Sequence, residues 1–290
     1  MFRRFAYFIA MNLAIMVTLT VIMVGVDIAF PEWSADLGYW ALIIIPSVFW
    51  GFGGAILSLV FSKWMAKSAT GARVITTPQN QQEAWLLQTV QNQARHVGIG
   101  MPEVAIYESG EVNAFATGPT KSSSLVAVSR GLLNGMNADE VEAVLAHEIS
   151  HIANGDMVTL TLIQGTLNSF VYIISRVLGY ALASRFGRDR STQRTIFRIT
   201  YFLTSIVLML GATVIVRWFS RQREYRADAG AASLVGPQKM IAALYRLKSQ
   251  AEPQLPENME AMGISGRASA LFSTHPKLDD RIAALMSPGR

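Results

Sequence analysis

The segment His147-Glu148-Ile149-Ser150-His151 has the spacing of a metal-binding motif, H-E-x-x-H. Residues four apart lie on the same face of an α-helix, so two imidazoles at this spacing can bind one metal ion. Glu148 lies beside them and can take a proton from a water molecule held by that metal. We therefore interpret the segment as a zinc hydrolase motif. The plainer alternative is two histidines that share a helix face by chance.

The flanking sequence favours the helix that this interpretation needs. Asn137 is the expected N-cap, and Glu140 three residues later completes a capping box. Asn154-Gly155 marks the end of the helix. The apolar residues that recur at helical spacing, away from the histidines, are Val141, Leu145, Ile149 and Ile152.

A catalytic zinc site normally has three protein ligands and one open position, so a third ligand is required. The chain has no Cys, which excludes thiolates. The metzincin pattern needs Gly and His where this chain has Asn154 and Met157. The best remaining candidate is Glu224, with Asp228 one turn later in position to orient a ligating His. On these residues alone, an ion pair between Glu224 and a nearby arginine is an equally good interpretation.

The composition indicates a membrane protein. A mean hydropathy of +0.31 with 16% charged residues is too apolar for an ordinary soluble domain of 290 residues. Two uncharged stretches, about residues 5–26 and 39–62, are each long enough to cross a bilayer, so residues 1–74 are expected to form two transmembrane helices. The first stretch has no small-residue cleavage site, so we interpret it as a retained span and not as a signal peptide.

The basic residues predict the orientation. Acidic residues and no Lys or Arg occupy the loop 27–38, whereas basic residues flank the outer ends of the two spans. The positive-inside rule then places both outer ends in the cytoplasm. Residues 75–156 and 220–290 are therefore expected to form a cytoplasmic peptidase domain. The net charge of +5 fits an anionic membrane surface, and no basic cluster with aromatic partners indicates nucleic-acid binding.

Residues 157–219 are expected to form an apolar helical hairpin, with helices at about 157–183 and 199–216. The loop between the two helices carries Arg185, Arg188, Arg190 and Arg194, which oppose transfer across a membrane. Gln164, Asn168 and Arg176 would also be costly if they faced lipid. Either the hairpin crosses with these side chains turned inward, or its tip stays in the interface. Both arrangements keep the two ligand segments on one side.

The remaining stretches predict a small module of helix and sheet. Thr77-Pro78 opens an expected helix that runs to about Val97. Short strands are expected at residues 104–108, 112–117 and 124–128, with Gly118-Pro119 as a turn between the last two.

Together these motifs resemble the HtpX-type membrane zinc metalloproteases, relatives of the CAAX prenyl proteases. The resemblance covers nearly the whole chain and implies a mainly α integral membrane protein with a cytoplasmic α+β zincin domain, of the gluzincin type, that contains a small β-sheet. The segments that carry it are Asn113-Ala114-Phe115-Ala116-Thr117-Gly118, the H-E-x-x-H motif with Gly155-Asp156, Glu224 to Asp228, and Thr274-His275-Pro276 with Arg281.

The resemblance also implies the roles of the site residues. One Zn²⁺ per chain is expected to be held by His147, His151 and Glu224, with Glu148 as general base. His275 is expected to stabilise the oxyanion; its alternative is a structural position ahead of Pro276 at a helix start. The remaining expected residues are those around the metal ligands (Asp156, Asp228 and Arg281) and those that bind substrate (Asn113, Ala114 and Phe115).

The implied function is quality control and stress response in the bacterial plasma (inner) membrane. The expected substrates are misfolded or damaged membrane proteins, bound as an added strand along a sheet edge, and the expected partners are the lipid bilayer and other membrane proteases. Two other classes are a zinc-binding scaffold that no longer cuts, which would not need Glu148, and a metal transporter, whose ligands would lie within the spans. An intramembrane protease would bury its motif in an apolar span, whereas Asp139, Glu140 and Glu142 lie on this helix.

Overall fold

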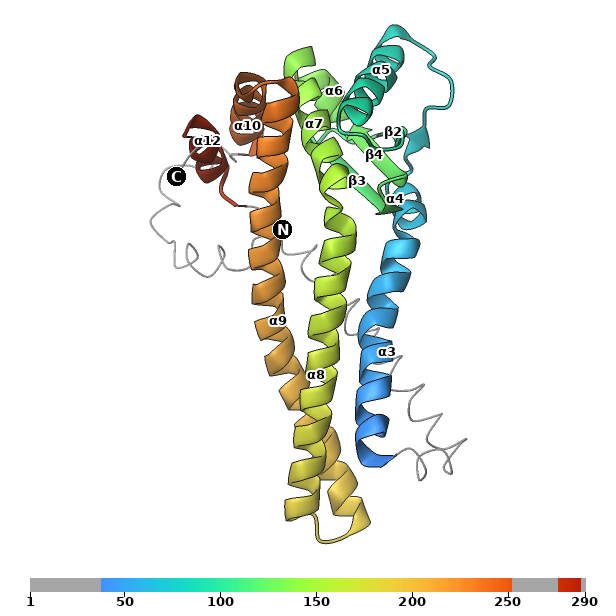
Figure 1. The fold of residues 1–290 in the computed structure, drawn as a ribbon, viewed down its shortest axis with the longest axis vertical. Helices are drawn as coiled ribbons and strands as arrows, with labels where there is room; N and C mark the ends of the chain where they lie inside the picture. Colours follow the sequence, from blue (N-terminus) through green and yellow to red (C-terminus); the bar gives the residue numbers. More distant parts are fainter. Residues whose placement is uncertain (1–37, 252–275, 288–290) are drawn as a thin grey trace. The chain divides into compact units, whose positions relative to one another are not determined.

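The computed structural model describes residues 38–251 and 276–287, so the first expected span, most of the loop 27–38, and His275 lie outside the described residues. The chain can be followed by colour in Figure 1. Its elements are α3 (Gly38–Val60), α4 (Ser62–Thr70), β1 (Arg73–Val74), α5 (Gln81–His96), β2 (Glu103–Tyr107), β3 (Ala114–Thr120), β4 (Ser123–Ser129), α6 (Arg130–Gly135), α7 (Ala138–Asn154), α8 (Asp156–Phe186), α9 (Arg190–Val235), α10 (Pro237–Ala251) and α12 (Leu278–Met286).

The chain divides into two compact units. Of the described residues, 38–56 and 162–212 form a helical unit, and 57–161, 213–251 and 276–287 form a mixed unit. Both α8 and α9 contribute residues to each unit.

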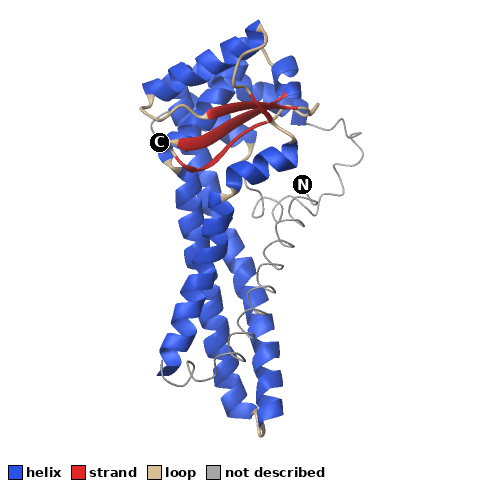
Figure 2. Ribbon diagram, turned by 90° about the vertical axis from the view of Figure 1, so that its right-hand side faces the viewer, coloured by secondary structure: helices blue, strands red, loops and turns tan. Residues whose placement is uncertain are grey.

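The mixed unit is built on a four-stranded sheet in the order β1-β2-β4-β3 (Figure 2). Strands β2 and β4 are parallel, and the two outer pairs are antiparallel. The three strands expected from the sequence are present with bounds shifted by a few residues, and β1 is an additional short strand. Among the described residues, β3 pairs only with β4, so it is an edge strand of the sheet.

The two faces of this sheet are covered by different helices. Alternate residues of β2 and β4, such as Val104 and Val126, pack into a core with Leu86 of α5 and Leu145 of α7. The intervening residues pack with Ala66 of α4 on the other face. The alternation follows from the period of two in a strand, and it fixes the α7 face that packs on the sheet.

Gly118-Pro119 is not the turn expected from the sequence. It lies within β3, where the pairing with β4 continues to Thr120 opposite Ser123 across a bulge. Gly118 has φ +147, and a Cβ there would lie 2.6 Å from Cα of Ser124 and would also overlap the carbonyl of Ser123. A bulge needs a residue without a side chain at such a point, so the glycine is required by the strand and not by a turn.

Two polar residues of α8 in the helical unit have hydrogen-bond partners, and one of these partners lies on α3. Gln164 donates to Oδ1 of Asn168 at 2.9 Å, and Asn168 Nδ2 lies 3.5 Å from the carbonyl oxygen of Gly51. The ring of Phe52 packs against Gly165, where a Cβ would meet it at 2.5 Å. The contacts of Asn168 and Gly165 join α3 to α8, and the side chains of Gln164 and Asn168 are half-buried. Whether the hairpin crosses a membrane remains a prediction.

The surface of the same helices is apolar. Among the described residues, α8 and α9 are long and apolar enough to cross a membrane, and α3 with α4 makes a third span if the two, bent by 55°, are counted as one. Large apolar side chains are exposed on these helices, including Phe170, Leu203 and Val207. Such exposure is typical of a lipid-facing surface and indicates a membrane protein.

Candidate metal centre

Helix α7 begins and ends where the sequence predicts. The side chain of Asn137 accepts a hydrogen bond from the backbone N–H of Glu140, and Glu140 accepts one from the backbone N–H of Asn137, each at 2.9 Å. This reciprocal pair is the predicted capping box. Gly155 ends the helix in the left-handed region, with φ 68. The chain then enters α8 at Asp156, close to the last turn of α7.

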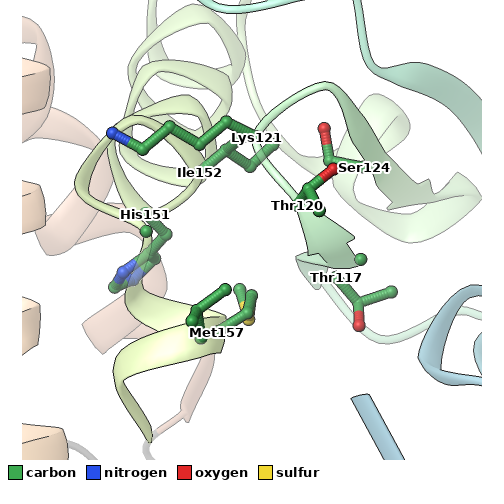
Figure 3. Close-up of a pocket in the computed structure, with 10 residues that line it drawn as sticks. Thr117, Thr120, Lys121, Ser124, His151, Ile152 and Met157 are labelled. Carbon is green, nitrogen blue, oxygen red and sulfur yellow. The ribbon is translucent and has the colours of Figure 1, made fainter. Parts of the chain in front are cut away.

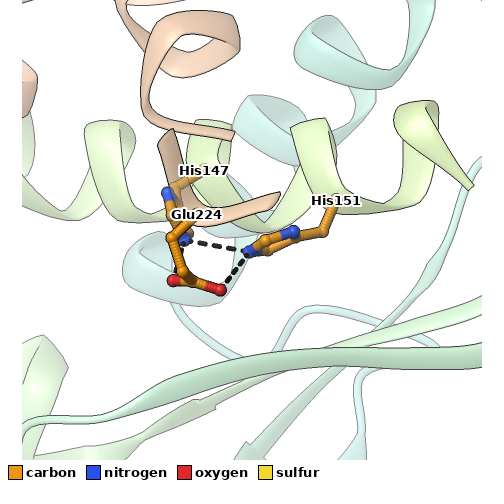
Figure 4. A group of neighbouring side chains, drawn as sticks. All are labelled: His147, His151 and Glu224. Atoms are coloured by element: carbon orange, nitrogen blue, oxygen red, sulfur yellow. Dashed lines mark hydrogen bonds and ion pairs between the residues drawn. The ribbon is translucent and has the colours of Figure 1, made fainter. Parts of the chain in front are cut away.

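Three buried side chains meet within the mixed unit (Figure 4). His147 and His151 project from one face of α7, and their Nε2 atoms are 3.1 Å apart. Glu224, on α9, places Oε2 at 3.6 Å from Nε2 of His147 and Oε1 at 3.5 Å from Nε2 of His151. Within the described residues, this is the set of His, Asp and Glu side chains that could share one metal ion.

The spacing of these atoms fits a tetrahedral metal site. Zinc–ligand distances of about 2.0–2.2 Å for nitrogen and oxygen place neighbouring ligand atoms about 3.3–3.6 Å apart. The three observed separations, 3.1, 3.5 and 3.6 Å, are close to that edge length. Two imidazoles and one carboxylate also form a donor set that is typical of catalytic zinc. The residues therefore fit a zinc ion.

Carboxylates hold the opposite nitrogen of each histidine. Nδ1 of His147 lies 2.9 Å from Oδ1 of Asp228, and Nδ1 of His151 lies 2.6 Å from Oδ2 of Asp156. An Nδ1–H that donates to a carboxylate leaves the lone pair of the neutral imidazole on Nε2. Both Nε2 lone pairs then face the same point, as metal ligation requires.

Arg281 completes the surroundings of Asp228. Its Nε and Nη2 donate to the two oxygens of Asp228 at 2.7 and 2.6 Å, and both side chains are buried. A bidentate pair of this kind fixes the plane of the carboxylate. Arg281 therefore acts on His147 through Asp228. It lies on α12, so it links the C-terminal helix to the ligands on α7 and α9.

The electrostatics of the metal-free centre favour a proton on His147. Burial by itself would lower the pKa of His147, but hydrogen bonds to Asp228 and Glu224 outweigh it and raise the pKa to about 9. The carboxylates around His147 therefore favour a positive charge at this point. Without a metal ion, that charge is a proton on His147. A metal ion must displace that proton in order to bind.

Glu148 differs from its neighbours on α7 in its exposure. His147, Ile149 and His151 are buried, whereas the side chain of Glu148 is half-buried. It is therefore the acidic group of the motif that solvent can reach.

The sequence of the chain matches the family model described as Peptidase family M48 over residues 80–288. The chain belongs to peptidase family M48. It is 50% identical to a protease HtpX homologue of Nitrosomonas europaea, over 99% of this chain and 100% of that protein. It is 51% identical to protease HtpX of Glaesserella parasuis, over 97% and 98% of the two chains. These relatives confirm the predicted resemblance and show that the chain is a metalloprotease.

The fold of this M48 peptidase is also shared with a solved structure. The crystal structure of S. mikatae Ste24p matches it with a TM-score of 0.66 at 20% sequence identity. The match covers 96% of this chain and 64% of that one, so the chain spans just under two thirds of the length of Ste24p.

A small cleft lies beside His151 of this M48 peptidase (Figure 3). It lies between the end of β3 and the junction of α7 with α8. The cleft is lined by residues that include Thr117, Thr120, Lys121, His151, Ile152 and Met157. His151 forms part of its wall, so the cleft borders one of the three proposed metal ligands.

The expected substrate-binding residues lie at the other end of β3. Asn113 precedes the strand, and its backbone N–H and C=O pair with Ser129 at 3.1 and 2.9 Å. Phe115 packs on Tyr107, with ring centroids 5.7 Å apart. Asn113, Ala114 and Phe115 are not among the residues that line the cleft. The sequence did not single out the cleft residues Lys121 and Met157, because neither belongs to a recognisable motif.

One further M48 residue near the ligands had no assigned role. Arg223 places Nη2 at 3.7 Å from Oε1 of Glu224. The sequence suggested such an arginine only as an alternative to metal binding by Glu224, whereas in the structure Glu224 lies near both Arg223 and the two histidines. A charge beside a ligand has no periodic signal, so only the three-dimensional contact reveals it.

Proposed function

We propose that this M48 peptidase binds one zinc ion through His147, His151 and Glu224 and hydrolyses peptide bonds in damaged or misfolded membrane proteins. The observation that carries the proposal is the buried group of three side chains whose ligand atoms lie close together. In addition, Nδ1 of each histidine contacts a separate carboxylate. When bound, zinc supplies a Lewis acid that polarises a carbonyl group and lowers the pKa of water toward about 7.

The remaining steps belong to side chains of this chain. Glu148 holds the attacking water and takes its proton as the oxygen bonds to the carbonyl carbon. It then gives that proton to the leaving amine as the C–N bond breaks. Asp156 and Asp228 keep the two imidazoles in the tautomer that leaves Nε2 available. His275, which lies outside the described residues, is proposed as a further group at the carbonyl oxygen, with Arg281 in support.

We propose that the substrate binds as an extended strand beside β3, which is an edge strand next to the metal centre. Ala114 and Phe115 would contribute through this edge, and Asn113, whose backbone N–H and C=O already pair with Ser129, would contribute through its side chain. Main-chain hydrogen bonds of this kind select an extended conformation more than a sequence. That property suits a protease that removes unfolded segments of many membrane proteins.

The proposed location is the bacterial inner membrane, with the mixed unit in the cytoplasm and the chain crossing several times. The distribution of basic residues around the loop 27–38 supports this orientation. In intact cells, a cysteine at exposed Ser122 should resist a membrane-impermeant maleimide, and a cysteine at Ser191 should react if the α8–α9 hairpin crosses. Labelling at Ser122 without disruption of the cells would overturn the orientation.

The activity itself can be tested on the purified protein in detergent. It should contain one zinc per chain by elemental analysis and cleave unfolded casein. A chelator should abolish cleavage, and added zinc should restore it. Cleavage that persists at the original rate after zinc has been removed would contradict the proposed function.

A further inference from the structure

Two arginines flank the carboxylate of Glu224 on different sides. Nη1 of Arg281 lies 3.9 Å from Oε2, and Nη2 of Arg223 lies 3.7 Å from Oε1. Both separations are too long for a hydrogen bond, so neither arginine donates to the oxygen of Glu224 that it approaches. The two guanidinium groups differ in what else they bind, and that difference indicates their roles.

Arg281 already has its acceptors. Two of its nitrogens donate to Asp228 at 2.6 and 2.7 Å. Arg223 has no comparable partner: its Nε is buried, and none of the described residues accepts a hydrogen bond from it. The side chain of Arg223 is 18% exposed. A buried guanidinium donor without an acceptor is unfavourable, so a bound molecule that supplies an acceptor would relieve it.

Arg223 does not itself line the cleft, but it lies next to a proposed metal ligand, Glu224. Oε1 of Glu224, the oxygen that Arg223 approaches, is also the oxygen 3.5 Å from Nε2 of His151. His151 forms part of the cleft wall. Consecutive side chains on a helix diverge by about 100°, so Arg223 must turn back toward Glu224 to reach this position. Its Nη2 therefore lies on the side of the helix that carries Glu224.

We infer that Arg223 is a catalytic residue that donates hydrogen bonds to the carbonyl oxygen of the scissile peptide. As water oxygen bonds to the carbonyl carbon, the π pair of the C=O bond moves onto that oxygen and makes it an oxyanion. Arg223 stabilises this negative charge without transferring a proton, since the guanidinium keeps its protons at all accessible pH values. When the C–N bond breaks, the pair returns to re-form the carbonyl. This role rests on the proposed function of the centre.

A purely positional role for Arg223 makes the opposite prediction for metal binding. If Arg223 only held Glu224 in place, its removal would release the carboxylate and lower the affinity for zinc. If Arg223 serves the substrate, its positive charge competes with the metal for Glu224, and its removal leaves zinc affinity equal or higher. Zinc affinity, measured by competition with a chelator, therefore separates the two roles independently of catalysis.

The test uses the full-length protein in detergent, with fluorescently labelled casein as substrate. Arg223→Gln should lower kcat/KM by about 10²–10³-fold, the usual effect of removing one oxyanion donor, while zinc affinity is unchanged or higher. Guanidinium ion should restore part of the activity of Arg223→Ala, and sodium ion at equal ionic strength should not. Arg130→Gln is the matched control, because Arg130 pairs with exposed Glu108 away from the centre, and it should behave as wild type.

Three results would overturn this role: zinc affinity that falls in parallel with cleavage, wild-type kcat/KM in Arg223→Gln, or no rescue by guanidinium.

Arg223→Lys covers the case in which the neutral variants do not fold. It keeps the charge beside Glu224 but not the planar donor set, so it should lose cleavage by about tenfold or more, and wild-type cleavage by it would also overturn the role. Activity in Glu148→Gln would instead refute the proposed function. An inactive Glu148→Gln with a fully active Arg223→Gln would refute the Arg223 role alone.

Discussion

Asp156, the first residue of α8, lies 2.6 Å from Nδ1 of His151, near the end of α7. The left-handed Gly155 between the two helices brings the carboxylate back toward the histidine that precedes it by five residues. The junction of the two helices thus orients a proposed metal ligand. Changes at this junction should affect metal binding even though Asp156 is not itself a ligand.

Asp156→Asn should lower zinc affinity by about 10–100-fold, the usual effect of losing a carboxylate behind a ligating histidine. The amide can still accept the Nδ1–H but no longer provides a negative charge. Chelator competition measures the change. Asp139→Asn, which alters an exposed carboxylate paired with Lys239, is the control and should bind zinc as tightly as wild type. Equal affinity in Asp156→Asn would show that the contact has no role in ligation.

Glu224→Gln and Glu224→Ala should both reduce zinc affinity sharply, because the metal would keep only two protein ligands. The free-metal dependence of zinc occupancy, measured at limiting metal, gives the change. Glu103→Gln is a suitable comparison, since Glu103 pairs with Lys63 and Lys67 away from the centre. It should cost about 0–1 kcal/mol of stability and leave zinc affinity unchanged. Full occupancy of Glu224→Ala at limiting zinc would remove Glu224 from the ligand set.

Zinc affinity should fall as the pH falls below about 9. The pKa of His147 is raised from its ordinary 6.5 to about 9 in the folded, metal-free protein. The imidazolium form therefore stabilises the metal-free protein fully below pH 6.5, and this contribution is lost as the pH rises through about 9. Metal binding requires the neutral imidazole of His147, so the metal ion and the proton compete for His147.

At pH 7.5, zinc binding should therefore release about one proton from His147. Isothermal titration calorimetry in buffers of different protonation enthalpy measures this number. Asp228→Asn removes a hydrogen bond that raises the pKa of His147 and should reduce the release. A heat of binding that does not depend on the buffer would contradict the proton assigned to His147.

Arg281→Met should destabilise the folded protein by about 3–5 kcal/mol, because it leaves Asp228 buried without its partner. Thermal unfolding of the metal-free protein in detergent measures the loss. Lys248→Met provides the matched control, since Lys248 pairs with Asp279 of the same helix α12 at 2.8 Å on an exposed surface. That variant should cost only about 0–1 kcal/mol. Equal effects of the two changes would show that the Arg281–Asp228 pair is not a buried, stabilising contact.

The sequence predicts those elements of the fold that depend only on residues close together in the chain. The capping box of α7 depends on Asn137 and Glu140 alone, and both of its hydrogen bonds form as expected. The bulge at Gly118 depends on the partner strand β4, which a local pattern does not contain, so the glycine was misinterpreted as a turn. For the same reason, the short strand β1 was not expected, because its two residues pair with distant β2.

In the candidate site too, the sequence predicts what depends on neighbouring residues and misses what depends on distant segments. The helical spacing of His147 and His151 indicates a shared metal without any further information. Glu224 is distant in the sequence, and its neighbouring arginines made an ion pair an equally good interpretation until the family resemblance favoured metal binding. The structure places both an arginine and the two histidines around this carboxylate. Contacts between distant segments, such as the one between Arg281 and Asp228, require the folded chain.

Glu148→Gln tests the central claim most directly, because it separates metal binding from catalysis. Gln has nearly the same shape as Glu but cannot take a proton. The variant should bind one zinc per chain with wild-type affinity and lose about 10²–10⁴-fold in the rate of casein cleavage. Glu142→Gln, on the same helix and paired with Lys239, should retain full cleavage. Wild-type cleavage by zinc-loaded Glu148→Gln would contradict the account.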